Sequence, residues 1–165
     1  MLLRILSLLV LLFLPGAMHA ASICHPGETA YFVCSFSAKT AVLCGSTEKA
    51  SGAKLLQYRI SKARRVEMKY PNSPQPPERR FFQSSILLAH GGETRVSFSL
   101  GEYKYVLYET WDTRSPSYGG IYVLRHGKLL QQYQCDDYTN PNASLFESMP
   151  KNLLPPEEYV DLYAP

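Results

Sequence analysis

Short runs that alternate apolar and polar residues, separated by turns, dominate the chain after its first twenty residues. In the run 28–36, Phe32, Cys34 and Phe36 fall on one side of an extended strand, because side chains two positions apart share a face of a sheet. Comparable runs occupy residues 55–60, 66–70, 94–100, 103–111, 121–125 and 128–135. This alternation predicts half-buried antiparallel strands joined as hairpins.

Strands that follow one another through tight turns predict an antiparallel meander. We expect an all-β domain of seven to eight strands that forms a small barrel or sandwich. One short C-terminal helix is expected at 144–149, where Ser144 and Glu147 have the spacing of a capping box. Residues 21–150 then form a single β-rich domain, and residues 151–165 form a loosely attached tail.

The first twenty residues have the pattern of a secretory signal peptide. Arg4 precedes an apolar run at 5–14, and small residues at Ala20 and Ala21 follow a Pro-Gly break. The apolar run is shorter than the roughly 20 residues that a membrane-spanning helix requires. We therefore expect cleavage after residue 20, a periplasmic or secreted product, and no membrane span after cleavage.

All four cysteines lie after this segment, and an even number in an exported chain predicts two disulfides, for which three pairings exist. Folding the first hairpin about Lys39 places Cys34 opposite Cys44, at the spacing that a disulfide needs. This register favours a Cys34–Cys44 bridge and leaves Cys24 to join Cys135. Zinc binding is the competing use of the cysteines, but the chain has no Cys-x-x-Cys pair, so no metal is expected.

The charge of the chain is small but unevenly distributed. The formal net charge of +3 is too low to indicate a nucleic-acid-binding protein. Residues 21–80 hold ten Lys and Arg against four Asp and Glu, whereas residues 81–165 hold six against ten. This pattern is typical either of a solvated dipolar surface or of a basic face that meets an acidic partner.

The sequence contains no recognisable set of catalytic residues. It has no Gly-x-Ser-x-Gly motif, and its cysteines are expected in bridges. His90 and His126 stand beside glycines at turns, and Asp136 and Asp137 follow the last strand, where acids commonly mark a turn. We therefore expect a protein that is not an enzyme and needs no cofactor. Its twelve tyrosines suit a contact surface as well as a core.

The second half of the chain contains two notable stretches before Cys135. They read Tyr103-Lys-Tyr-Val-Leu-Tyr and Gly119-Gly-Ile-Tyr-Val-Leu-Arg-His-Gly-Lys. In these motifs the chain resembles the small periplasmic lysozyme inhibitors of Gram-negative bacteria, in particular inhibitors of invertebrate-type lysozyme. The first half, with Leu43-Cys-Gly and Leu56-Gln-Tyr-Arg, is similar to exported proteins that have no assigned role. The resemblance implies a β-rich binding protein whose Ser-Gly-x-Tyr loop enters the lysozyme cleft.

Two segments correspond to this inhibitory motif. Gly119-Gly-Ile-Tyr122 has glycine in place of the serine, and Ser115-Pro-Ser-Tyr118 keeps the serine and tyrosine but lacks the glycine. Residues 112–120 are expected to form a long hairpin loop, and arginine and tyrosine are prominent among binding hot spots. The expected partner-binding residues are Arg114, Ser115, Ser117, Tyr118, Gly119, Gly120 and Tyr122.

Two functions are consistent with these features. The first is a lysozyme-inhibitor-like protein that inserts the 112–122 loop into a lysozyme cleft. The alternative is a periplasmic structural or adaptor protein that makes no lysozyme contact and uses its basic first half. In both cases the expected partner is a protein and not a nucleic acid.

Overall fold

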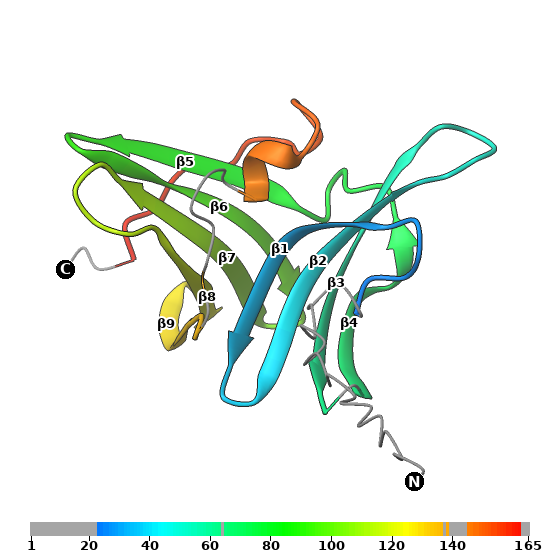
Figure 1. Ribbon diagram of the computed structural model, residues 1–165, viewed down its shortest axis with the longest axis horizontal. Helices are drawn as coiled ribbons and strands as arrows, with labels where there is room; N and C mark the ends of the chain where they lie inside the picture. Colours follow the sequence, from blue (N-terminus) through cyan, green and yellow to red (C-terminus); the bar gives the residue numbers. More distant parts are fainter. Residues whose placement is uncertain (1–22, 64, 137, 139–144, 163–165) are drawn as a thin grey trace, which may run out of the picture.

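The computed structural model describes residues 23–63, 65–136, 138 and 145–162, so the expected signal peptide at 1–20 lies outside the described residues. Within these residues the chain forms nine strands and confirms the all-β class (Figure 1). Every pair of neighbouring strands is antiparallel and consecutive in sequence, as expected for a meander. The strand number is slightly higher than the seven to eight expected.

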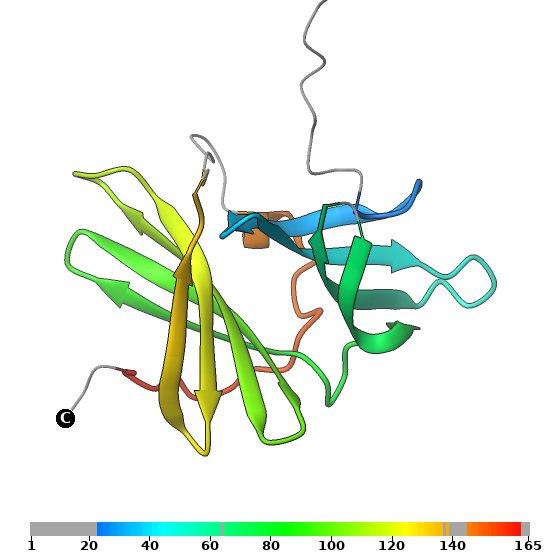
Figure 2. The same cartoon turned by 90° about the horizontal axis from the view of Figure 1, so that it is seen from below.

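The strands form two separate sheets. The four-stranded sheet contains β1 (Thr29–Phe36), β2 (Lys39–Thr47), β3 (Lys54–Lys62) and β4 (Arg65–Gln75). The five-stranded sheet contains β5 (Phe82–Leu88), β6 (Gly91–Leu100), β7 (Tyr103–Asp112), β8 (Tyr118–Arg125) and β9 (Lys128–Gln134). Figure 2 shows the five-stranded sheet at the left and the four-stranded sheet at the right, and the described strands form a sandwich-like arrangement and not a closed barrel.

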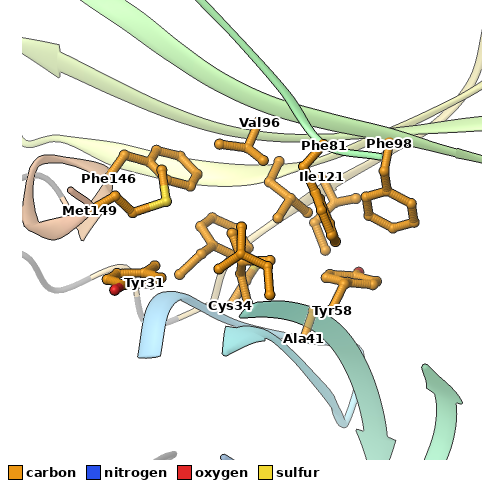
Figure 3. Packing of buried hydrophobic residues seen from close by; sticks show 14 of the residues in the cluster. Tyr31, Cys34, Ala41, Tyr58, Phe81, Val96, Phe98, Ile121, Phe146 and Met149 are labelled. Carbon is orange, nitrogen blue, oxygen red and sulfur yellow. The ribbon is translucent and has the colours of Figure 1, made fainter. Parts of the chain in front are cut away.

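Aromatic side chains pack together with aliphatic ones between the sheets (Figure 3). The ring of Phe98 on β6 is at the centre of this cluster, with centroid distances of 4.9 Å to Tyr58 and 4.7 Å to Tyr70 on the opposite sheet. On its own sheet it stacks on Tyr105 at 5.1 Å, and Phe81 meets it edge-on at 5.5 Å. Because each such ring buries a large apolar area, this cluster is the main link between the layers.

The expected C-terminal helix is a single turn of 3-10 helix, η2 (Leu145–Ser148). Its Phe146 stacks on Phe32 of β1 with ring centroids 5.6 Å apart, so the turn covers one end of the core. The proposed capping serine, Ser144, lies outside the described residues. In the described part of the chain, no helical segment approaches the length and hydrophobicity that crossing a lipid bilayer requires.

The disulfide pairing predicted from the first hairpin is wrong. The bridges are Cys24–Cys44 and Cys34–Cys135, and no described cysteine is free. Neither the expected Cys34–Cys44 bridge nor the expected Cys24–Cys135 bridge forms.

The cause is the position of the turn between β1 and β2. Ser37 and Ala38, with φ of 47° and 61°, form a two-residue turn, so Cys34 lies opposite Ala41 and not opposite Cys44. A displacement by an odd number of residues moves a side chain to the other face of the sheet. Cys34 therefore packs in the core between the sheets, and Cys44 packs on the outer face with Val42.

The segment after η2 is attached to the five-stranded sheet, in contrast to the loosely attached tail that we expected at 151–165. Its backbone follows β5, with Gln83 N–H donating to Pro155 O at 2.9 Å and Glu157 N–H donating to Gln83 O at 2.8 Å. The Glu157 carboxylate then pairs with Lys104 at 2.7 Å and accepts a hydrogen bond from Ser97 Oγ. The described part of the tail is thus an integral part of the domain.

Candidate partner-binding site

The expected binding loop is shorter than predicted, because β8 begins at Tyr118. The connection between β7 and β8 is therefore residues 113–117, and it contains Arg114, Ser115 and Ser117. The first two are exposed, Ser117 is partly exposed, and the Tyr118 side chain is 45% exposed at the first position of its strand. These four residues form the part of the expected site that a partner can reach.

The other three expected residues are buried in β8. The Tyr122 ring stacks on Tyr108 with centroids 4.1 Å apart, in a small cluster on the outer face of the five-stranded sheet. A Cβ on Gly119 would overlap the ring of Tyr138, and a Cβ on Gly120 would overlap the ring of Tyr108. The two glycines thus allow close packing of tyrosine rings, which explains the Gly-Gly pair without a partner.

The 113–117 loop lies against the turn between β5 and β6. Thr113 donates its backbone N–H to His90 O at 2.8 Å, and its hydroxyl reaches the same oxygen at 3.2 Å. The Arg114 guanidinium contacts Nε2 of His90, and the Arg114 N–H donates to Asp112 Oδ1 at 2.7 Å. Both views show the two connections side by side at the far left of the molecule (Figures 1 and 2).

Large apolar side chains are exposed at this end of the five-stranded sheet. Leu87 is 81% exposed, Leu88 60% and Trp111 43%. Together with Tyr118, Arg114 and His90 they form what we name the sheet-end patch. A hollow of about 360 Å³ lies within the patch and is lined by Leu88, His90, Trp111 and Tyr118 among other residues.

The register of the strands places the patch on both faces of the sheet. Leu87 and Trp111 both lie opposite Gly92 of β6, so they flank this glycine on one face. The indole Nε1 is 3.0 Å from where a Cβ of Gly92 would be, which shows that Trp111 lies directly over the glycine backbone. Tyr118 lies opposite Thr110, the neighbour of Trp111, and so projects from the other face. The patch therefore covers both faces of the five-stranded sheet at this projecting end.

Sequence reasoning identified Arg114 and Tyr118 but missed Leu87, Leu88 and Trp111. The pair Gly91-Gly92 opposite the single tryptophan was the available signal, because a large ring can cover a strand only where side chains are absent. The two turns that meet here are 24 residues apart in sequence, as measured from His90 to Arg114. Only the pairing of β6 with β7 brings them together.

One group of three potential metal ligands occurs among the described residues, at Cys24, Glu28 and Cys44. The two sulfur atoms are joined in a disulfide, so neither is available as a thiolate. The Glu28 carboxylate is held by Arg59. This group is therefore part of the structural framework and offers no metal site.

Comparison of the chain with protein-family models, with curated proteins and with solved structures finds no match.

Proposed function

We propose that the protein is an exported, non-enzymatic binding module that docks on a protein partner through the sheet-end patch. The observation that carries the proposal is the exposure of Leu87, Leu88, Trp111 and Tyr118 at one projecting end of a sheet. Exposed apolar side chains gathered in this way mark interaction sites, and tryptophan, tyrosine and arginine dominate binding hot spots. The two disulfides of this small β domain are compatible with export.

The shape of the patch favours a concave partner surface. Two hairpin ends project together, with apolar groups on both faces and the Arg114 guanidinium between them. A cleft that holds carboxylates would complement this arrangement, because it could enclose the aromatic rings and receive the arginine. We infer from this, together with the sequence resemblance, that a lysozyme is the partner and that inhibition is the outcome.

The direct test is to titrate the purified protein against invertebrate-, chicken- and goose-type lysozymes while following lysis of peptidoglycan. Inhibition of one type is expected, and Trp111→Ala and Tyr118→Ala should each weaken it by about 2 kcal/mol, about 30-fold. Tyr103→Ala is the matched control, because Tyr103 is an exposed tyrosine at the opposite end of β7. Its inhibition constant should equal that of the unmodified protein.

Absence of inhibition by micromolar protein of intact fold would contradict the lysozyme proposal. The adaptor function would then be the better explanation, with exposed Lys62, Arg65 and Lys69 at the β3–β4 hairpin as the basic surface to test next. Equal loss of inhibition in the Tyr103 control and in the patch variants would instead show that the patch is not the contact surface.

A further inference from the structure

A cavity of about 610 Å³ lies between the two sheets, away from the sheet-end patch. Its mouth lies near the β1–β2 turn, which is at the lower end of Figure 1. Exposed or half-exposed residues at this turn, on β4 and on β9 form the mouth: Ser37, Lys39, Glu67, Leu130 and Gln131. Its walls are formed by aromatic and aliphatic side chains in equal number: Phe36, Tyr58, Ile60, Met68, Tyr105, Ile121, Val123 and Tyr133. The volume is within the range of small-molecule sites.

Several of the wall residues are only partly buried, although they face the core. Ile60, Met68, Tyr105, Val123 and Tyr133 pack against the buried core cluster on one side and line the cavity on the other. Protein interiors are usually close-packed. Apolar side chains that line an unfilled cavity of this size therefore indicate a binding site for a small molecule.

The charges around the cavity cancel. Among the described residues that line it, Lys39 and Glu67 are the only charged ones, and their side chains pair at 2.8 Å. A bound anion or cation would therefore have to disrupt this ion pair to find a counter-charge. The cavity is accordingly suited to a neutral molecule.

One buried hydroxyl group of the lining has no hydrogen-bond partner. Tyr58 is fully buried, and its Oη is without a partner in the described structure. Burial, with a smaller contribution from Tyr105, raises the pKa of Tyr58, so the phenol stays protonated and remains a donor. A buried donor of this kind is costly unless an acceptor reaches it.

We propose that this cavity binds a neutral aromatic molecule that carries a carbonyl group, and that the Tyr58 hydroxyl donates a hydrogen bond to this carbonyl. The Tyr58 side chain lines the cavity but has no exposed surface, so binding requires a neighbouring side chain to shift when the ligand enters. The rings of Phe36, Tyr105 and Tyr133 then provide flat surfaces for stacking. Binding of this molecule in the cavity is independent of the sheet-end patch.

The test uses the neutral fluorophore 6-propionyl-2-(dimethylamino)naphthalene, which has an aromatic body and one carbonyl acceptor. Titration into the unmodified protein should give saturable binding with one site and emission shifted to the blue. Met68→Trp, which fills the cavity, should weaken binding about tenfold or more. Val66→Trp is the matched control two residues away on the same strand, because Val66 is exposed and does not line the cavity. Equal affinities of these two variants, both shown to be folded by circular dichroism, would overturn the proposal.

Tyr58→Phe tests the hydrogen bond itself. It should weaken binding of the carbonyl probe about threefold or more, while binding of 2-(dimethylamino)naphthalene, which lacks the carbonyl, should not change. An equal effect on both compounds would overturn the role of Tyr58. Displacement of the probe by 1-dodecanol at lower concentrations than by 2-acetylnaphthalene would overturn the assignment of an aromatic ligand and indicate an acyl chain.

Discussion

The Arg59 guanidinium holds the Glu28 carboxylate through two hydrogen bonds on the outer face of the four-stranded sheet, with Nη1–Oε2 at 2.6 Å and Nη2–Oε1 at 2.8 Å. The arginine side chain is 1% exposed. It also donates to Ile23 O at 2.9 Å and to Gln57 Oε1 at 2.6 Å. These contacts fasten the segment before β1 to the centre of the sheet, beside the Cys24–Cys44 bridge.

Removal of the negative charge from this pair should destabilise the fold strongly. Glu28→Gln leaves the buried Arg59 guanidinium without a counter-charge, and breaking a buried pair in this way costs about 3–5 kcal/mol. Urea unfolding of the variant should show this loss in the free energy of unfolding at pH 7. Glu78→Gln, at an exposed glutamate, is the control and should stay within about 0.5 kcal/mol of the unmodified protein.

The same pair predicts a pH dependence of stability. Burial of Glu28 opposes its ionisation, but hydrogen bonds from Arg59 and the His25 N–H, together with the arginine charge, lower its pKa below the ordinary value of 4.5. Its contribution is therefore complete above pH 4.5 and is lost as the pH falls through the lowered folded-state pKa. The difference in unfolding free energy between the unmodified protein and Glu28→Gln should shrink below pH 4.5. A constant difference from pH 7 to pH 3 would contradict this explanation.

The second hairpin shows how much of the fold the sequence predicts. Alternation centred on Ala63 places Tyr58 opposite Met68, whereas the structure places it opposite Tyr70 and pairs Met68 with Ile60. The error is two residues at these positions, and a shift by an even number keeps Tyr58, Met68 and Tyr70 on the face that was predicted. Val66, predicted on the same face, is the exception, because an irregularity between Ile60 and Ser61 pairs it with Ser61 and leaves it exposed.

The first hairpin shows why the disulfides could not be predicted in the same way. Its register differs by three residues from the symmetric fold about Lys39, which reverses the face of Cys44 relative to Cys34. Ser37 and Ala38 adopt positive φ, and neither is a residue that favours this conformation, so the sequence gives no sign of a two-residue turn. The sheet-end patch was missed for a related reason, because it depends on contact between two separate hairpins.

The two disulfides should contribute unequally to stability. Cys34–Cys135 joins the two sheets over a sequence separation of 101 residues, and Cys24–Cys44 spans 20. Loop entropy then predicts that the free energy of unfolding falls by about 4.7 kcal/mol when both cysteines of Cys34–Cys135 are replaced by alanine. The same replacement at Cys24–Cys44 should lower it by about 3 kcal/mol. Urea unfolding measures both values, and peptide mapping without reduction checks the pairing. Recovery of a Cys34–Cys44 peptide would contradict the register of β1 and β2.

Tyr118 and Tyr122, each the tyrosine of one of the two segments that correspond to the inhibitory motif, should behave in opposite ways when truncated. Tyr122→Ala removes a buried ring that stacks on Tyr108, so it should cost about 3–5 kcal/mol of folding stability. Tyr118→Ala removes a half-exposed ring that meets Tyr108 only edge-on at 6.3 Å, and it should cost no more than about 1.5 kcal/mol. Thermal unfolding separates the two variants. Equal destabilisation would show that Tyr118 is also a core residue and unsuited to partner binding.

The C-terminal segment should stabilise the domain through one carboxylate. Glu157 is half-buried and meets the outer face of the five-stranded sheet, where it accepts from Ser97 Oγ and pairs with Lys104 Nζ at 2.7 Å. Hydrogen bonds to charged groups contribute about 1.5–3 kcal/mol, so Glu157→Gln should lower the free energy of unfolding by about 1.5 kcal/mol or more. Its neighbour Glu158 is exposed, and Glu158→Gln is the matched control with an expected change within about 0.5 kcal/mol.

A second measurement distinguishes loss of this contact from general destabilisation. The backbone hydrogen bonds of Gln83 to Pro155 and to Glu157 hold the segment along β5. Amide exchange at position 157 should therefore accelerate in the Glu157→Gln variant, while exchange in β7 and β8 should change little. The Glu158→Gln variant should exchange at the rate of the unmodified protein. If both variants exchanged equally, or if the loss of stability were spread evenly over β7 and β8, the carboxylate would not be what fastens the segment to the sheet.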